Sequence, residues 1–313
     1  MILCCGEALI DMVPETSISG DPCFVPKVGG AVFNTAVALG RLSSKVALFT
    51  GVSRDFFGNQ LTQELENSQV SKEHLSYQAG PTTLAFVHLE NGLATYTFYT
   101  ENAADTTLLP ENCPSTEFDF NALFFGGISL CTDPTASTML NLMRKRSERS
   151  VTMLDPNIRP SFISDEISYR RHLKEMISLS DILKISDEDL HWLVPNHQDL
   201  QTQIEKLVGT SDILVLITKG SKGAEAFHAG QKIAQASSPK VDVKDTVGAG
   251  DTFNAGFLHS ILQSDALTKQ YCRSPSVPVL NKALAYATRA ASVTVSRIGA
   301  NSPWRSEMSR RLS

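Results

Sequence analysis

Short apolar runs alternate with longer helical patterns along most of this chain, and this alternation leaves few folds open to it. The runs that read as strands are Met1–Ala8, Val46–Thr50, Leu123–Gly126, Val151–Leu154, Ile182–Ile185 and Ile213–Thr218. The helical stretches are Ala31–Leu42, Phe56–Asn67, Pro134–Arg149, Asp165–Leu179 and Gln201–Val208. Short, continuously apolar runs are typical of parallel strands buried on both faces. The pattern predicts an α/β fold: a doubly wound, mostly parallel sheet flanked by helices, in one domain over residues 1–313.

Two stretches interrupt the alternation. Thr83–Leu89 and Leu93–Tyr99 are rich in β-forming residues, and Glu90-Asn91-Gly92 between them is a hairpin signal. Val13–Val28 looks irregular because it carries three prolines and a glycine. We expect residues 12–29 and 81–102, approximately, to form a small β-rich flap. On pattern alone it is either a lid over a ligand or a surface hairpin without a role in binding.

Composition and charge exclude several classes of protein. Hydrophobic residues make up 42% and charged residues 19%, which is ordinary for a soluble globular protein. A net charge of −5 argues against a dedicated nucleic-acid binder. No uncharged apolar run approaches the ~18–20 residues needed to span a bilayer. No basic residue precedes Lys27, and the six cysteines form no C-x-x-C pair. We therefore expect a cytoplasmic protein with reduced thiols and no membrane partner.

The segment DTVGAGDTFNAGF, residues 245–257, carries the strongest chemical signal. Gly248, Ala249 and Gly250 precede a stretch to Leu262 that reads as a buried helix, and free backbone N–H groups at a helix start favour anions. Asp251 follows directly. It is either a first-turn acid that stabilises the helix, or a proton acceptor beside a phosphoryl group with the loop as its anion hole. Spacing alone leaves both interpretations open.

Two other phosphate-binding motifs are absent. No segment fits the Walker A pattern G-x-x-x-x-G-K-[ST]. A dinucleotide fingerprint needs a third glycine where Phe253 stands. A nucleotide-dependent oxidoreductase is therefore disfavoured.

Further polar residues stand where predicted strands end. Asp11 follows the first strand, and Asn34 lies in the helix that Gly29 and Gly30 open; their side chains suit neighbouring sugar hydroxyls. Arg159, in LDPNIRP, suits a phosphate. Because ligands of open α/β sheets bind beyond the carboxyl ends of the strands, we expect these residues to lie close together.

The chain resembles a known family at these motifs. GGAVFN at 29–34 and DTVGAGDTFNAGF at 245–257 resemble the two signatures of PfkB-type, ribokinase-like carbohydrate kinases. The resemblance continues through GEALID at 6–11, TGVSRDFFG at 50–58, LDPNIRP at 154–160, KISDEDL at 184–190 and ITKGSKGA at 217–224. This combination is most similar to bacterial fructokinases. It implies transfer of phosphate from ATP to a primary hydroxyl, from D-fructose to fructose 6-phosphate. The alternatives are a 2-keto-3-deoxygluconate kinase, a ribokinase and, more distantly, a sugar-binding protein without catalysis.

The resemblance also implies roles for individual residues. Asp251 would be the base, with the backbone of Gly248, Ala249 and Gly250 as anion hole and Arg159 at the transferred phosphate. The residues implied in sugar binding are Asp11, Gly29, Gly30, Asn34, Phe98, Asn157 and Asp251. Those implied in ATP binding are Lys184, Ser186, Thr218, Lys219, Gly220, Gly223, Gly250, Asn281 and Ala285.

Metal binding is less clearly implied. The family often carries N-x-x-E for indirect Mg²⁺ binding, whereas this chain has Ser186-Asp187-Glu188-Asp189. Either Glu188 or Asp189 would then organise Mg²⁺ through water, which Mg²⁺ readily keeps. Asp245 stands where the monovalent-cation loop of the family begins, so the resemblance implies activation by K⁺. The edges of the flap favour pairing between two copies of the chain, as a homodimer.

Overall fold

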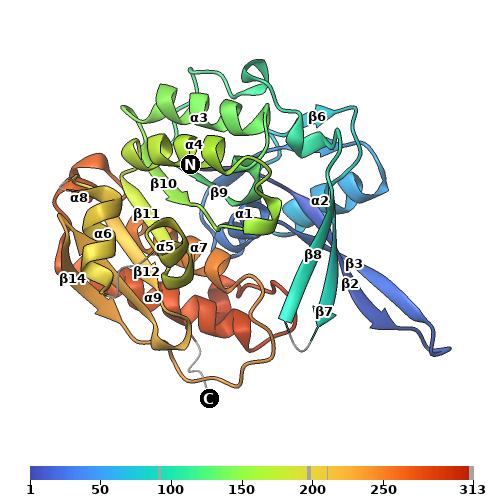
Figure 1. Cartoon of the computed structure of the whole chain (residues 1–313). Helices are drawn as coiled ribbons and strands as arrows, with labels where there is room; N and C mark the ends of the chain where they lie inside the picture. The colour runs from blue at the N-terminus through green and yellow to red at the C-terminus, as the bar shows by residue number, and fades with distance from the viewer. Residues whose placement is uncertain (91–92, 196–198, 210, 310–313) are drawn as a thin grey trace.

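The computed structural model describes residues 1–90, 93–195, 199–209 and 211–309, and its centre is an eight-stranded sheet (Figure 1). The strands lie in the order β14-β13-β12-β11-β10-β9-β1-β4. Their bounds are β1 Ile2–Cys5, β4 Val46–Phe49, β9 Ala122–Gly126, β10 Val151–Asp155, β11 Ile182–Ser186, β12 Leu214–Thr218, β13 Ala224–His228 and β14 Gln231–Ala236. The strands from β12 to β4 pair in parallel, and β13 and β14 add antiparallel pairs at one edge.

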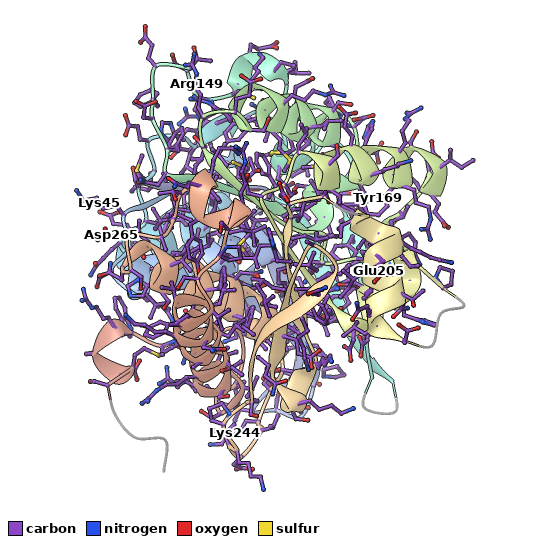
Figure 2. The ribbon with its side chains drawn as sticks, turned by 90° about the vertical axis from the view of Figure 1, so that its left-hand side faces the viewer. Lys45, Arg149, Tyr169, Glu205, Lys244 and Asp265 are labelled. Atoms are coloured by element: carbon purple, nitrogen blue, oxygen red, sulfur yellow. The ribbon has the colours of Figure 1, made fainter. Side chains whose placement is uncertain are left out.

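Helices cover both faces of this sheet. One core contains residues of α1 Ala31–Arg41, α2 Phe56–Asn67, α7 Ala249–Leu262, α8 Lys269–Arg273 and α9 Val277–Val295. The other contains residues of α3 Thr135–Arg146, α4 Glu166–Ser178, α5 Asp187–Leu193 and α6 Leu200–Val208. In Figure 2, Tyr169 of α4 and Glu205 of α6 lie on one side, and Lys45 and Asp265, which follow α1 and α7, lie on the other. The predicted doubly wound α/β fold is confirmed.

A second, four-stranded sheet projects beside the first (Figure 1). Its order is β3-β2-β7-β8, from β2 Leu9–Thr16, β3 Pro22–Gly29, β7 Leu84–Glu90 and β8 Leu93–Tyr99. β2 pairs antiparallel with β3, β7 antiparallel with β8, and β2 parallel with β7. A third small sheet joins β5 Gly51–Ser53 to β6 Ser76–Gln78. The hairpin signal Asn91-Gly92 lies outside the described residues.

Val13–Val28, expected to take part in the flap, does so as two regular strands of the second sheet and not as an irregular stretch. β2 and β3 pair residue by residue from Leu9–Gly29 to Thr16–Pro22. Proline has no backbone N–H to donate, so it fits at positions where a strand has no neighbour to accept that hydrogen bond. Pro22 and Pro26 lie on the edge strand β3, and Pro14 lies beyond Met12, where β2 ceases to pair with β7.

The prediction of one strand over Met1–Ala8 with Asp11 at its end is wrong. β1 stops at Cys5, and Leu9 begins β2 in the second sheet. The break consists of Gly6, Glu7 and Ala8, and apolar residues stand on both sides of it. Asp11 therefore belongs to the second sheet, not to the end of β1.

Within residues 1–90, 93–195, 199–209 and 211–309, no helix is both long and apolar enough to cross a bilayer.

Candidate active site

A cavity of about 270 Å³ brings together residues from the second sheet, from loops that follow strands of the main sheet, and from the starts of α1 and α7. Its walls are formed by Glu7, Leu9, Asp11, Gly30, Ala31, Asn34, Tyr96, Phe98, Ile128, Asn157, Arg159 and residues 246–251. The predicted base, anion loop, phosphate-binding arginine and most predicted sugar-binding residues are among them. Segments as far apart in the sequence as Glu7 and Asp251 thus meet at one place.

Asp251 lies in the first turn of α7 and is 7% exposed. Asn34 Nδ2, from α1, donates a hydrogen bond of 2.9 Å to its Oδ2. Burial raises the pKa of Asp251 to about 7, and the charge of Asp155 acts in the same direction. The hydrogen bond from Asn34 and the charges of Lys184 and Arg159 act to lower this pKa. A carboxyl group that titrates near neutral pH is suited to proton transfer.

The loop before Asp251 presents backbone donors. Gly248 is the N-cap of α7 in the left-handed conformation, with φ of 76°. The first intrahelical bond is donated by Thr252 N to Gly248 O, at 2.9 Å. The N–H groups of Gly250 and Asp251 precede it and have no acceptor within the helix. Two backbone donors beside a buried carboxylate can bind an anion there.

The opposite wall comes from the second sheet. Asp11 lies in β2, and burial raises the pKa of its carboxyl group to about 6. Gly29, its neighbour on β3, does not line the cavity; a Cβ there would meet the Asp11 carboxylate, so the missing side chain gives Asp11 room. Phe98 of β8 stacks with Tyr96 and contacts Phe162 edge to face. This wall combines a polar group with aromatic faces.

Glu7 is a cavity residue that the sequence interpretation did not identify. Its Oε1 accepts hydrogen bonds from Ala31 N (2.8 Å) and Val32 N (3.3 Å), and its Oε2 accepts one from Ser129 N (3.3 Å). Burial raises its pKa, and these backbone donors act against the shift. The carboxylate thereby fixes the start of α1, the helix that carries Asn34. An acid inside an apolar run was the available signal, because a buried carboxylate needs partners.

Of the residues expected to bind ATP, Gly250 lines the cavity and the others lie outside its lining. Ser186 and Thr218 are register partners at the carboxyl ends of β11 and β12, and Ser186 Oγ also caps α5. Lys219, in the turn that follows, pairs with Glu225. Gly220 and Gly223 lie in the same turn, and both have positive φ. Asn281 and Ala285 are exposed on α9. The strand-end residues therefore lie together at one edge of the main sheet, and the other two lie on a helix that packs against β13 and β14.

Lys184 is buried, with 3% exposure, and its Nζ donates to Asp155 Oδ2 at 2.9 Å. Of the two acids considered for Mg²⁺, Glu188 is exposed and Asp189 is half-buried. Burial raises the pKa of Asp189, and the Lys184 charge acts to lower it. Over the described residues, no group of three or more His, Cys, Asp or Glu side chains is placed to hold a metal ion. This arrangement fits a metal held largely by phosphates and water.

Asp245 ties two loops together. Its Oδ1 accepts a hydrogen bond from Val247 N (3.0 Å) and its Oδ2 one from Gly299 N (2.8 Å). Both carboxylate oxygens thus already bind backbone donors, and the loop that leads to α7 is held against residues 299–300.

Comparisons with known proteins agree with this geometry. A family model described as "pfkB family carbohydrate kinase" matches residues 1–307. A fructokinase of Rhizobium leguminosarum bv. trifolii is 44% identical over 276 residues, which cover 88% of this chain and 83% of the relative. A probable chloroplastic fructokinase-6 of Arabidopsis thaliana is 32% identical over 312 residues, covering 96% of this chain and 78% of the relative.

Solved structures agree as well. The fructokinase of Xylella fastidiosa with bound ATP has a TM-score of 0.86 at 27% identity, and the match covers 98% of this chain and 96% of that one. A fructokinase double mutant of Vibrio cholerae O395, bound to fructose, ADP and potassium ion, has a TM-score of 0.82 at 25% identity, with 96% and 93% covered. The resemblance drawn from the motifs and the ribokinase-like fold are both confirmed. The chain belongs to the pfkB family of carbohydrate kinases.

Proposed function

We propose that this chain is an ATP-dependent sugar kinase that phosphorylates the primary hydroxyl of D-fructose to give fructose 6-phosphate. The observation that carries the proposal is the Asp251 carboxylate, which is buried beside the first N–H groups of α7 and faces a cavity lined by polar residues. The names of a similar relative and of a similar solved structure support fructose as the acceptor.

The proposed reaction uses the chain's own groups as follows. Asp11, Asn34 and Asn157 hold the sugar hydroxyls. Asp251 accepts the proton of the primary hydroxyl, and the oxygen of that hydroxyl forms a bond to the γ-phosphorus of ATP. The bond between the γ-phosphorus and the β,γ-bridging oxygen breaks at the same time, so that ADP leaves. The N–H groups of the loop and Arg159 stabilise the charge on the phosphoryl oxygens. The second sheet, as a lid, excludes water from the cavity.

We place ATP along the carboxyl ends of β11 and β12. There Ser186, Thr218, Lys219, Gly220 and Gly223 surround the phosphates, with Asn281 and Ala285 towards the adenine. Lys184, also expected to bind ATP, is buried against Asp155 and contributes its charge from behind the anion loop. Glu188 or Asp189 would hold the water shell of Mg²⁺, which neutralises phosphate charge when bound. The loop beginning at Asp245 would hold K⁺.

Turnover with a panel of acceptors tests the substrate. Arg159 is the one lysine or arginine among the described residues that line the cavity, and it is assigned to the phosphoryl group. The carboxylate of a sugar acid would therefore find no second cation among the described residues of the lining. With MgATP, we expect kcat/KM for fructose to exceed that for 2-keto-3-deoxygluconate, ribose and adenosine by at least about tenfold, measured as ADP release.

Three other results would change the proposal. A preference for the keto acid would keep the kinase and overturn the sugar. Turnover with none of the four acceptors by a folded protein would overturn the kinase. Calorimetric sugar binding in that case would support a binding protein.

We also propose a homodimer through the second sheet. Its aromatic cluster joins Phe86 to Phe24 and Tyr99, with ring centroids 5.0 and 5.4 Å apart. Phe24 and Tyr99 are 43% and 63% exposed, which leaves apolar area for a partner. Light scattering should give twice the chain mass, and Phe24→Asp should give the monomer mass. A monomeric wild-type protein at the concentration of the activity assay would contradict the dimer.

A further inference from the structure

A buried ion pair lies behind the anion loop. Asp155 ends β10, Lys184 stands within β11 and Asn254 lies in α7; none is more than 3% exposed. Lys184 Nζ and Asn254 Nδ2 both donate to Asp155 Oδ2, at 2.9 and 2.7 Å. Asp155 Oδ1 accepts a hydrogen bond from Asn157 N at 3.2 Å. The pair thus connects two strands, the helix of Asp251 and a residue of the cavity wall.

The ammonium group of Lys184 lies directly against the loop. A Cβ placed on Gly250 would stand 3.3 Å from Lys184 Nζ, with no other heavy atom outside its chain neighbours and helix backbone within 4 Å. Glycine at this position therefore lets the cation approach the backbone that presents N–H groups to the cavity. A positive charge behind these donors strengthens their attraction for an anion in front of them.

The same pair acts on Asp251. The charge of Asp155, on β10, raises the pKa of the Asp251 carboxyl group, and the charge of Lys184, on β11, lowers it. The other charged groups facing it are Arg159, from the loop after β10, and the cavity acids Glu7 and Asp11. Asn34 adds the hydrogen bond from α1.

We propose that Asp155 and Lys184 form a positioning unit for catalysis, in which Lys184 supports the anion loop and keeps Asp251 charged, and Asp155 holds Lys184 in place. The inference rests on the proposed function, since it takes Asp251 as the proton acceptor. An apolar pair of similar volume fills such a space with little or no loss of stability, so stability alone does not account for an ion pair here.

The test is the pH dependence of kcat/KM for fructose at saturating MgATP in Lys184→Met, Asp155→Asn and the double variant. Asp251 works as the carboxylate, so activity falls as the pH falls through its pKa. Lys184→Met leaves the Asp155 charge unopposed and should move this acid limb up by about one pH unit. Asp155→Asn leaves the Lys184 charge unopposed and should move it down. Both single variants should melt at lower temperature than wild type.

The double variant buries neither charge and is expected to fold even where a single variant does not. Its acid limb should lie near that of wild type, because the two effects cancel. Its kcat should fall about tenfold at an unchanged melting temperature, because the loop has lost the cation behind it. Wild-type kcat in a folded double variant would overturn the proposal.

The Asp181–Lys269 pair provides a matched control. It joins the same two residue types at 2.6 Å, at the opposite end of β11 from the cavity. Asp181→Asn and Lys269→Met should lower the melting temperature and leave the acid limb in place. Limbs that stay fixed, or move in the same direction, in Lys184→Met and Asp155→Asn would overturn the role of the pair. An acid limb that persists in the residual activity of Asp251→Asn would instead overturn the assignment of Asp251.

Discussion

The Asp251→Asn variant is expected to lose about 10²–10⁴-fold in kcat without losing stability. Asparagine keeps the volume, and its side-chain oxygen still accepts the hydrogen bond that Asn34 donates. The variant lacks only the capacity to take a proton. Fructose-dependent ADP release and thermal melting, measured on the same preparation, separate this loss from unfolding.

The stability of the variant should depend on pH in a defined direction. In the folded wild type the pKa of Asp251 is raised to about 7, above its ordinary value of 3.8. Wild type therefore loses stability as the pH rises from about 4 to about 7, because the unfolded chain releases this proton while the folded chain retains it. Asparagine does not titrate, so the variant's melting temperature should rise relative to wild type over this range and then stay level. Because Asp251 must be ionised to accept a proton, kcat/KM of wild type should decrease as the pH falls below about 7.

An exposed aspartate provides the control for this substitution. Asp212 lies just before β12, away from the cavity, and Asp212→Asn should change neither kcat nor its pH dependence. Near-normal turnover in Asp251→Asn would contradict the catalytic role and leave Asp251 as a residue that stabilises only the helix start.

The sequence predicted the main sheet well because its strands are buried on both faces. Runs such as Leu123–Gly126 are apolar throughout, and the observed β9 differs from that run by one residue. The second sheet was harder to predict. Its prolines look like strand breakers. Only the observed positions of Pro22 and Pro26 on the edge strand β3, and of Pro14 beyond the pairing of β2 with β7, explain why they fit.

The candidate site was partly predictable for a similar reason. Asp251, Asn34 and Arg159 belong to motifs at strand ends or helix starts, and the fold brings them to one cavity. Glu7 and Asp155 were missed as site residues because their roles depend on partners distant in the sequence. Glu7 binds the start of α1, and Asp155 binds a lysine of the neighbouring strand. A charged residue within an apolar run shows that a partner exists, but only the structure identifies it.

The Gly248→Ala variant is expected to lose about 10²–10³-fold in kcat, because the N–H donors of the anion loop would move. Gly248 has φ of 76°, and a Cβ on it would lie 2.7 Å from Ala300 Cβ and 2.9 Å from Ala300 Cα. Backbone atoms cannot give way as a flexible side chain can. The loop itself would therefore shift, and the free energy of unfolding should fall by about 1–3 kcal/mol.

Gly209→Ala separates backbone strain from displacement of the loop. Gly209 also has positive φ, 60°, but a Cβ there would meet no atom within 4 Å, and the residue ends α6 away from the cavity. Alanine at 209 should lower the melting temperature and leave kcat unchanged. Suppose that Gly248→Ala, like Gly209→Ala, lowered the melting temperature and left turnover unchanged. The backbone of residues 248–250 would then not stabilise the transferred phosphoryl group. Arg159 would then be the group that stabilises the negative charge on the phosphoryl group, because it is the cation that lines the cavity among the described residues.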